Sequence, residues 1–214
     1  MIVTDTPTTS SAERAYLHTK ALIVRGDLPG GQLISEGQIC EALNISRTPV
    51  HEAFLRLAAE QLIVLSSRKG AVVAPISPRE AQDVLEMREA IERSAAARIA
   101  AEGGPTATTV ARLKALLDEQ RTAIDRDDSD AFLAADDEFH AQIIAAGNNA
   151  IALHLFGQLR DRQQRLRNHL MRTREEYGPV LDEHSAMFAR LEASDLDGFV
   201  AVLSAHVNRF DGVL

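Results

Sequence analysis

The chain has 214 residues, of which 45% are hydrophobic and 25% are charged, and this composition excludes a disordered or fibrous protein. A single cysteine, Cys40, excludes a disulfide framework and a cysteine-rich zinc module. No apolar run approaches the roughly 20 residues of a membrane-spanning helix, so we expect no membrane contact. The polar first residues do not resemble a secretory signal, and we expect a cytoplasmic protein.

The charge is unevenly distributed along the chain. The formal net charge of −8 falls on residues 76–214, because residues 1–75 carry as many basic as acidic side chains. A locally neutral N-terminal part on an acidic protein is typical of a nucleic-acid-binding module that is attached to a second domain.

The first predicted elements are helices, which follow a tail of residues 1–11 that we expect to be flexible. Ser10 and Ser35 each stand three residues before a Glu or Gln, which is the capping box that begins a helix. The predicted helices end at about Arg25, at Leu43 and, for the one from Ser46, at about Gln61. Two β-branched runs around a glycine turn then predict a hairpin, at residues 62–65 and 71–74. This order predicts a winged helix-turn-helix over residues 12–76.

The third helix of this module is the predicted DNA-reading element. Its first residues would enter the major groove, where Arg47 can bond the O6 and N7 atoms of guanine and short hydroxyl side chains can contact phosphate. Basic side chains at the hairpin tip suit the DNA backbone or the minor groove. We therefore predict DNA contacts from Ser46, Arg47, Thr48, His51, Arg68, Lys69 and Gly70. The alternative is a small structural three-helix unit with ordinary surface charges.

Residues 77–214 are predicted to be all-helical. Ser77, Pro78 and Glu80 form a strong helix start, and this helix ends at Gly103. Further helices are predicted at about 106–126, 129–146, 149–173, 179–193 and 195–211. Six helices with short links indicate an antiparallel bundle. The predicted fold is thus mostly α, with a winged helix-turn-helix followed by an all-α six-helix domain.

Three of these helices carry polar, ligand-type side chains on otherwise apolar stripes. Asp136 and His140 share one face at positions i and i+4, and His184 and His206 lie on the stripes of the last two helices. Such groups are costly to bury without partners, and one divalent cation would satisfy all four. The set suits Zn or Ni, and also Mn, Fe or Co. The alternative is that each histidine is a hydrogen-bonded core residue.

An arginine on an apolar stripe allows two similar interpretations. Arg88 lies on the apolar stripe of its helix and is expected to point into the bundle. There it would either bind an acidic effector or pair with Glu92 or Asp136. The arginine run over residues 160–167 is expected to form a solvated face.

The N-terminal motifs resemble those of the GntR family of bacterial transcription regulators. The resemblance covers about residues 12–76, and its most specific part is the Ser-Arg-Thr-Pro-Val segment at 46–50, after the Leu-Pro-Gly-Gly-Gln-Leu-Ile-Ser-Glu run at 28–36. It implies a DNA-binding regulator. The family usually has arginine where Gly37 and His51 stand, so the usual family operator does not follow.

The C-terminal motifs resemble the FCD ligand domain of FadR-like members of that family. Asp136 and the Phe-His pair at 139–140 fit its Asp-x-x-Phe-His pattern, and a Gly-Asn pair follows at 147–148. The resemblance covers about residues 80–211, and six helices fit the VanR-like branch. It implies an effector near Arg88 and a metal held by Asp136, His140, His184 and His206. Asp137 is an alternative register for the carboxylate ligand.

Together these patterns predict a homodimeric regulator that binds a palindromic double-stranded DNA operator and responds to a small carboxylate effector. The helix at 80–101 and its neighbours are plausible dimer surfaces. Two other classes remain open at this point, which are a metal-dependent helical-bundle enzyme and a metal-free dimeric DNA-binding protein. The sequence does not predict the effector, the operator, the native metal or the direction of regulation.

Overall fold

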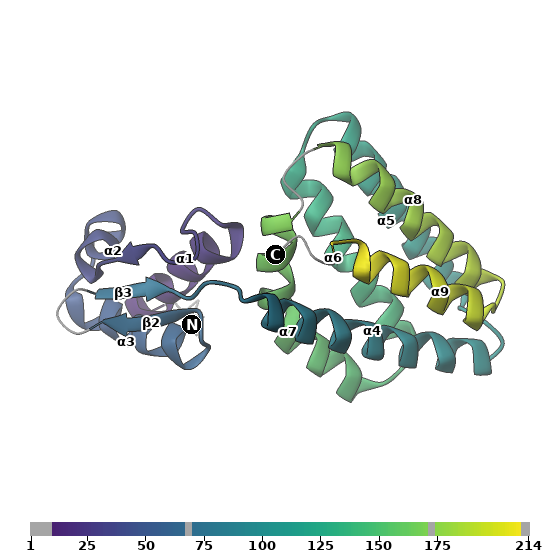
Figure 1. Ribbon diagram of the computed structural model, residues 1–214, viewed down its shortest axis with the longest axis horizontal. Helices are drawn as coiled ribbons and strands as arrows, with labels where there is room; N and C mark the ends of the chain where they lie inside the picture. The colour runs from purple at the N-terminus through teal and green to yellow at the C-terminus, as the bar shows by residue number, and fades with distance from the viewer. Residues whose placement is uncertain (1–9, 67–69, 171–173, 211–214) are drawn as a thin grey trace, which may run out of the picture. The chain divides into compact units, whose positions relative to one another are not determined.

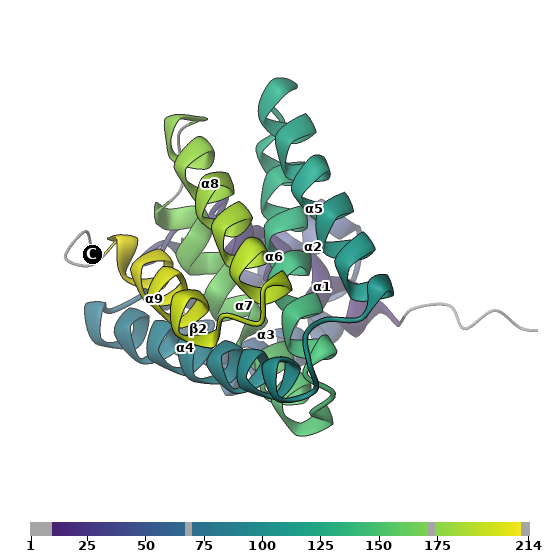
Figure 2. The same ribbon diagram turned by 90° about the vertical axis from the view of Figure 1, so that its right-hand side faces the viewer.

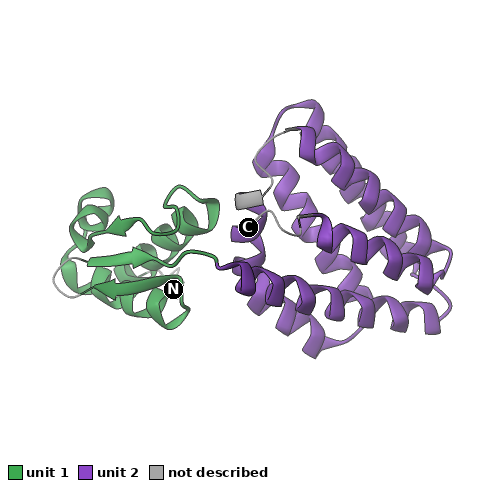
Figure 3. Ribbon diagram, in the orientation of Figure 1, with its two compact units in different colours: residues 1–76 green, residues 77–214 purple. Residues whose placement is uncertain are grey.

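The computed structural model describes residues 10–66, 70–170 and 174–210, and the chain divides into two compact units, residues 1–76 and 77–214 (Figure 3). The mostly helical fold that the sequence predicts is confirmed, with a winged helix-turn-helix in unit 1 and an all-helical unit 2. Among the described helices, none combines the length and the apolar character that crossing a bilayer requires.

In its described residues, unit 1 consists of three helices and a small antiparallel sheet (Figure 1). Its elements are α1 (Ser11–Arg25), β1 (Leu33–Ile34), α2 (Glu36–Leu43), α3 (Arg47–Ala59), β2 (Ile63–Ser66) and β3 (Gly70–Val73). The strand order is β1-β3-β2, with Ile34 opposite Ala71 and Ile63 opposite Val73. The predicted hairpin is present. β1 was not predicted, because two residues are too few to show an alternating pattern.

Local capping explains where these helices begin and end. Ser35 and Gln38 form the complete predicted capping box at the start of α2. Asn44 ends α2 in the left-handed conformation, with φ of 53°. One face of α3 is then buried in the core of unit 1, where Phe54 and Leu57 are wholly inaccessible to solvent. The opposite face of α3 is left exposed.

Unit 2 contains six α-helices in its described residues, with a final 3-10 turn (Figure 2). They are α4 (Pro78–Ala101), α5 (Ala107–Asp125), α6 (Ser129–Ala146), α7 (Ala150–Leu170), α8 (Arg174–Glu192) and α9 (Leu196–Val207), and the turn is Asn208–Phe210. α5 packs against α6 and α8, α8 packs against α9, and α4 packs against α6, α7 and α9. Apolar side chains such as Phe139, Met187 and Phe199 fill the space between them.

The start of α8 differs from the prediction. The Gly-Pro pair at 178–179 was expected to separate two helices, but α8 begins at Arg174 and contains Pro179. Tyr177 stacks on Phe132 with ring centroids 4.4 Å apart, and Val180 is buried beside them. This packing stabilises a helical turn in which Pro179 leaves one backbone hydrogen bond unmade.

Candidate metal centre and nucleic-acid interface

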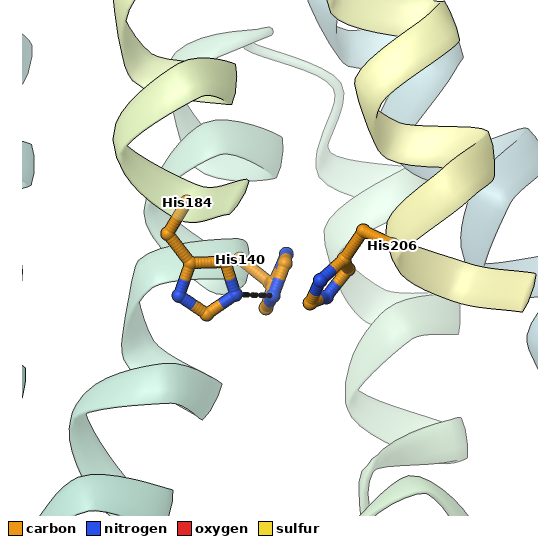
Figure 4. A group of neighbouring side chains, drawn as sticks. All are labelled: His140, His184 and His206. Atoms are coloured by element: carbon orange, nitrogen blue, oxygen red, sulfur yellow. Dashed lines mark hydrogen bonds between the residues drawn. The ribbon is translucent and has the colours of Figure 1, made fainter. Parts of the chain in front are cut away.

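Three histidines from three helices meet at one point inside unit 2. His140 of α6, His184 of α8 and His206 of α9 have their candidate ligand nitrogens within 4.8 Å of one another (Figure 4). Their exposed fractions are 0%, 0% and 7%. Three separate helices therefore bring the three predicted histidines together in the core.

Each imidazole ring is held by an oxygen atom on the side away from this point. In every case the ring Nδ1 atom makes the contact, and the partner is a carboxylate or a side-chain amide oxygen. The pairs are His140 with Glu92 at 2.7 Å, His184 with Gln120 at 2.8 Å and His206 with Glu183 at 2.9 Å. An oxygen partner at Nδ1 keeps the proton there and directs the Nε2 lone pair inward, as in metal-binding histidines.

The converging Nε2 lone pairs need a hydrogen-bond donor or a positive charge between them. The Nε2 atoms of His140 and His184 are 3.1 Å apart, and with both protons on Nδ1 neither can donate to the other. Two facing lone pairs at this distance repel unless a hydrogen-bond donor or a cation lies beside them. Donor atoms placed about 2.1 Å from one metal ion are roughly 3 to 4 Å apart, so the spacing fits a bound metal.

Asp136 provides a carboxylate at the same point. Its Oδ1 atom lies 3.5 Å from Nε2 of His184 and 3.9 Å from Nε2 of His140. Its Oδ2 atom accepts a hydrogen bond from Nη1 of Arg167 at 2.5 Å. Burial opposes ionisation of Asp136, but the surrounding positive charges, of which Arg167 is the strongest, together outweigh burial and lower the pKa of this carboxyl group. The carboxylate is therefore ionised, as a metal ligand must be.

Burial has the opposite consequence for the histidines. It disfavours the charged imidazolium and lowers the pKa of His140 and of His184 well below the usual value, and the nearby Arg88 acts in the same direction on both. Both rings are therefore neutral near pH 7, which is the form that binds a metal.

Arg88 points into this centre from α4. Its side chain is buried, and its Nη2 atom contacts Nε2 of His140 and lies 3.1 Å from Nε2 of His206. Its Nε atom donates to Glu92 Oε1 at 2.9 Å. The pairing of Arg88 with Glu92 is thus present, and the same guanidinium also supplies positive charge beside two of the imidazoles.

The prediction for the arginine run of α7 is wrong for two of its members. Arg165 and Arg167 are each only 7% exposed rather than solvated. Arg167 bonds both Asp136 and Asp137, and Arg160 donates to Asp137 at 2.6 Å. Arg160 and Arg167 thus neutralise the two adjacent carboxylates of α6. Asp137 thus faces arginines rather than histidines.

Four residues that hold the imidazole rings or the Asp136 carboxylate were not predicted from the sequence in these roles. They are Gln120, Arg167 and Glu183, together with Glu92 in its contact with His140. Two signals were available, since Glu92 lies one helical turn after Arg88, and a pair of adjacent inward carboxylates requires buried positive charge. No such local signal exists for Gln120 or Glu183.

The predicted DNA-reading face lies at the start of α3. Ser46, Arg47 and Thr48 are exposed there. The side chain of His51 is 58% exposed, and its Nδ1 atom lies 2.7 Å from Oε1 of Glu36, at the start of α2. An acidic side chain thus stands next to a residue that is expected to approach the negatively charged DNA.

The wing residue Gly70 has a structural reason to be glycine. Its φ is +99°, and an added Cβ atom would lie 2.2 Å from the carbonyl oxygen of Ile34 in β1. Only a residue without a side chain lets β1 and β3 approach so closely. Arg68 and Lys69 lie outside the described residues, so their predicted DNA contacts stay predictions.

Comparisons with known proteins identify the class that this fold and this centre define. Residues 11–73 match the bacterial regulatory proteins of the gntR family, and residues 83–209 match the FCD domain. The chain belongs to the GntR family of transcriptional regulators that carry an FCD domain, and it is not an enzyme.

Individual relatives agree with this class. An HTH-type transcriptional regulator of Agrobacterium vitis is 34% identical over 140 residues, which cover 64% of this chain and 82% of the relative. The gluconate operon transcriptional repressor of Bacillus licheniformis is 26% identical and covers 95% of this chain and 84% of its own. The solved structure of McbR/YncC from E. coli superimposes with a TM-score of 0.76 at 21% identity, over 96% of this chain and 97% of that one.

Proposed function

We propose that this regulator senses a small organic acid through a divalent metal that is held by Asp136, His140, His184 and His206. The observation that carries the proposal is the ring of inward Nε2 lone pairs, each fixed by an oxygen at Nδ1. Nitrogen donors with one carboxylate favour Zn or Ni, with Mn, Fe and Co as alternatives. The metal would supply positions at which a carboxylate can bind.

Arg88 is the protein group that we propose to meet the effector. Its buried guanidinium lies beside His206, and with a metal bound to the histidines it would donate to the carboxylate of the effector instead of to the imidazoles. The gluconate operon repressor is a relative whose name refers to an operon for an acid, which is consistent with an acidic effector for this chain.

We propose that the protein binds a palindromic double-stranded DNA operator as a homodimer. The face formed by Ser46, Arg47, Thr48 and His51 would enter the major groove, with Arg68, Lys69 and Gly70 of the wing against the backbone or the minor groove. With Gly37 and His51 in place of the usual arginines, the preferred bases would differ from those of the common family operator. Exposed apolar side chains on two packed helices, Met87 of α4 and Ile151 and Leu155 of α7, support a dimer surface there.

The experiment that tests the sensing proposal uses the full chain and DNA selected with it from a random library. We expect about one metal ion per chain in elemental analysis, and a carboxylic acid from a screen that changes DNA affinity. In His140→Ala both the metal and the response to the acid should be lost, because one donor is missing. The exposed His154 of α7 provides the control His154→Ala, which should keep both.

Two results would contradict this proposal. Wild-type protein without metal would favour a metal-free DNA-binding protein. A response to the acid that survives in His140→Ala would place the sensing site elsewhere.

A further inference from the structure

Buried polar atoms without partners lie on α7, next to the candidate metal centre. Among the described residues, both side-chain polar atoms of Gln163 and the Nε atom of Arg167 have no hydrogen-bond partner. The two residues are only 2% and 7% exposed. Leaving such groups unpaired is costly, so a native protein retains them where a water or a ligand completes the site.

Arg167 connects these atoms to the candidate metal centre. Gln163 and Arg167 are one helical turn apart and therefore share one face of α7. Arg167 bonds Oδ2 of Asp136, whose Oδ1 atom lies 3.5 Å from Nε2 of His184. The Asp136 carboxylate thus lies between Arg167 and the histidines. α7 also packs against α4, the helix that carries Arg88.

The free bonding capacity of this pair is specific. The charge of Arg167 is already matched, because its Nη1 and Nη2 atoms donate to Asp136 and Asp137. What remains is one N–H donor on Arg167, with one amide donor group and one carbonyl acceptor on Gln163. A second carboxylate would be repelled by the two aspartates, and an ammonium group would be repelled by Arg167. A hydroxyl group, which both donates and accepts, fits what is left.

We infer that Gln163 and Nε of Arg167 form a hydroxyl-binding subsite of the effector pocket, so that the effector is a hydroxycarboxylic acid. Its carboxylate lies at the metal and Arg88, and one hydroxyl lies against the Gln163 amide. This inference rests on the proposed sensing function and names the ligand class within it. Gln163 then determines specificity without holding the metal.

The test compares acids that differ only by hydroxyl groups. Lactate with propionate, 3-hydroxybutyrate with butyrate and gluconate with hexanoate are titrated calorimetrically into the metal-loaded full chain. We expect at least one hydroxylated acid to bind wild type about tenfold or more tightly than its partner, because a site built for a hydroxyl rejects the analogue that lacks one. In Gln163→Met, which keeps the length of the side chain, the ratio should fall to about twofold or less, with the affinity for the plain acid unchanged. The partly exposed neighbour provides the control Gln164→Met, which should keep the wild-type ratio.

A second measurement separates a ligand subsite from a structural amide. The ligand-free Gln163→Met protein should keep its metal content and unfold at the same or a higher temperature than wild type, because no hydrogen bond within the protein is lost. Loss of the fold, loss of the metal or an unchanged hydroxyl preference in Gln163→Met would each overturn the inference. If wild type binds acids with no hydroxyl preference, only the subsite fails. If wild type binds none of the six acids, the proposed sensing function fails with it.

Discussion

Asp136 and Asp137 are adjacent and both buried, but their side chains have different surroundings. Asp136 faces two histidines with one oxygen and Arg167 with the other, whereas Asp137 is held by Arg160 and Arg167. The i, i+4 spacing to His140 was enough to predict which of the two approaches the imidazoles. The arginine partners were not predictable, because the buried face of α7 depends on how that helix packs in the domain.

Glu183 is a residue whose role is testable without altering a candidate ligand. Its carboxylate accepts from Nδ1 of His206 at 2.9 Å and from Arg209, and these partners outweigh burial and lower the pKa of Glu183. We expect Glu183→Gln to weaken metal binding by about tenfold or more, because a neutral partner makes the His206 ring a poorer donor. Competition with a metal-binding indicator dye measures the change.

A suitable control for this substitution is an exposed glutamate on the same helix. Glu192 pairs with Lys114 at the surface and does not touch the histidines. Glu192→Gln should leave the metal affinity at the wild-type value. Equal metal affinities for the two variants would show that Glu183 does not support the centre.

At the scale of the elements, the two serines that precede α2 and α3 differ in what their side chains do. Ser35 accepts from the backbone N–H of Gln38, whereas Ser46 occupies the same position before α3 and makes no capping hydrogen bond. The hydroxyl of Ser46 is thus available at the predicted DNA-reading face. Ser35 therefore stabilises the start of its helix, whereas Ser46 is expected to contact DNA.

This difference predicts opposite outcomes for two alanine variants. Ser35→Ala should lower the free energy of unfolding by about 1 kcal/mol, because a capping bond is lost, and Ser46→Ala should change it by less than about 0.5 kcal/mol. DNA affinity should fall in Ser46→Ala. Denaturant titrations and fluorescence anisotropy with the selected operator measure the two quantities. A large stability loss in Ser46→Ala, with unchanged DNA binding, would contradict the assignment.

Elements were predictable where local chemistry decides them. Caps at Ser10, Ser35 and Ser77 each accept the expected backbone hydrogen bond. The start of α8 was not predictable, since stacking of Tyr177 on a ring from α6 outweighs the Gly-Pro signal. β1 was missed for a related reason, because its two residues become a strand only by pairing with β3. Contacts between distant segments decide these cases.

For the whole molecule, the low pKa values of His140 and His184 make stability depend on pH. Both values lie below the 6.5 of an unperturbed histidine, so the unfolded chain binds more protons once the pH falls below about 6.5. The stabilisation is complete above that pH and is lost as the pH falls. We expect the metal-free protein to lose about 1.4 kcal/mol per pH unit for each of the two imidazoles below pH 6.

Denaturant titrations at several pH values measure this slope. His140→Gln with His184→Gln should flatten the pH dependence between pH 6 and 5, whereas the exposed His154→Gln should leave it unchanged. A slope that persists in the double variant would assign the proton uptake to other groups.

The enclosure of the three imidazoles also bears on the kinetics of the proposed sensor. With rings that are at most 7% exposed and each anchored at Nδ1, release of an ion would require its bonds to three fixed rings to break together, whereas an acid needs only the open positions of the ion. Exchange of the ion would then be slower than exchange of the acid. The ion that binds while the chain folds would then be retained through many cycles of acid binding. The metal in each regulator molecule would reflect the metals present at its synthesis, whereas its acid occupancy would follow the current acid concentration.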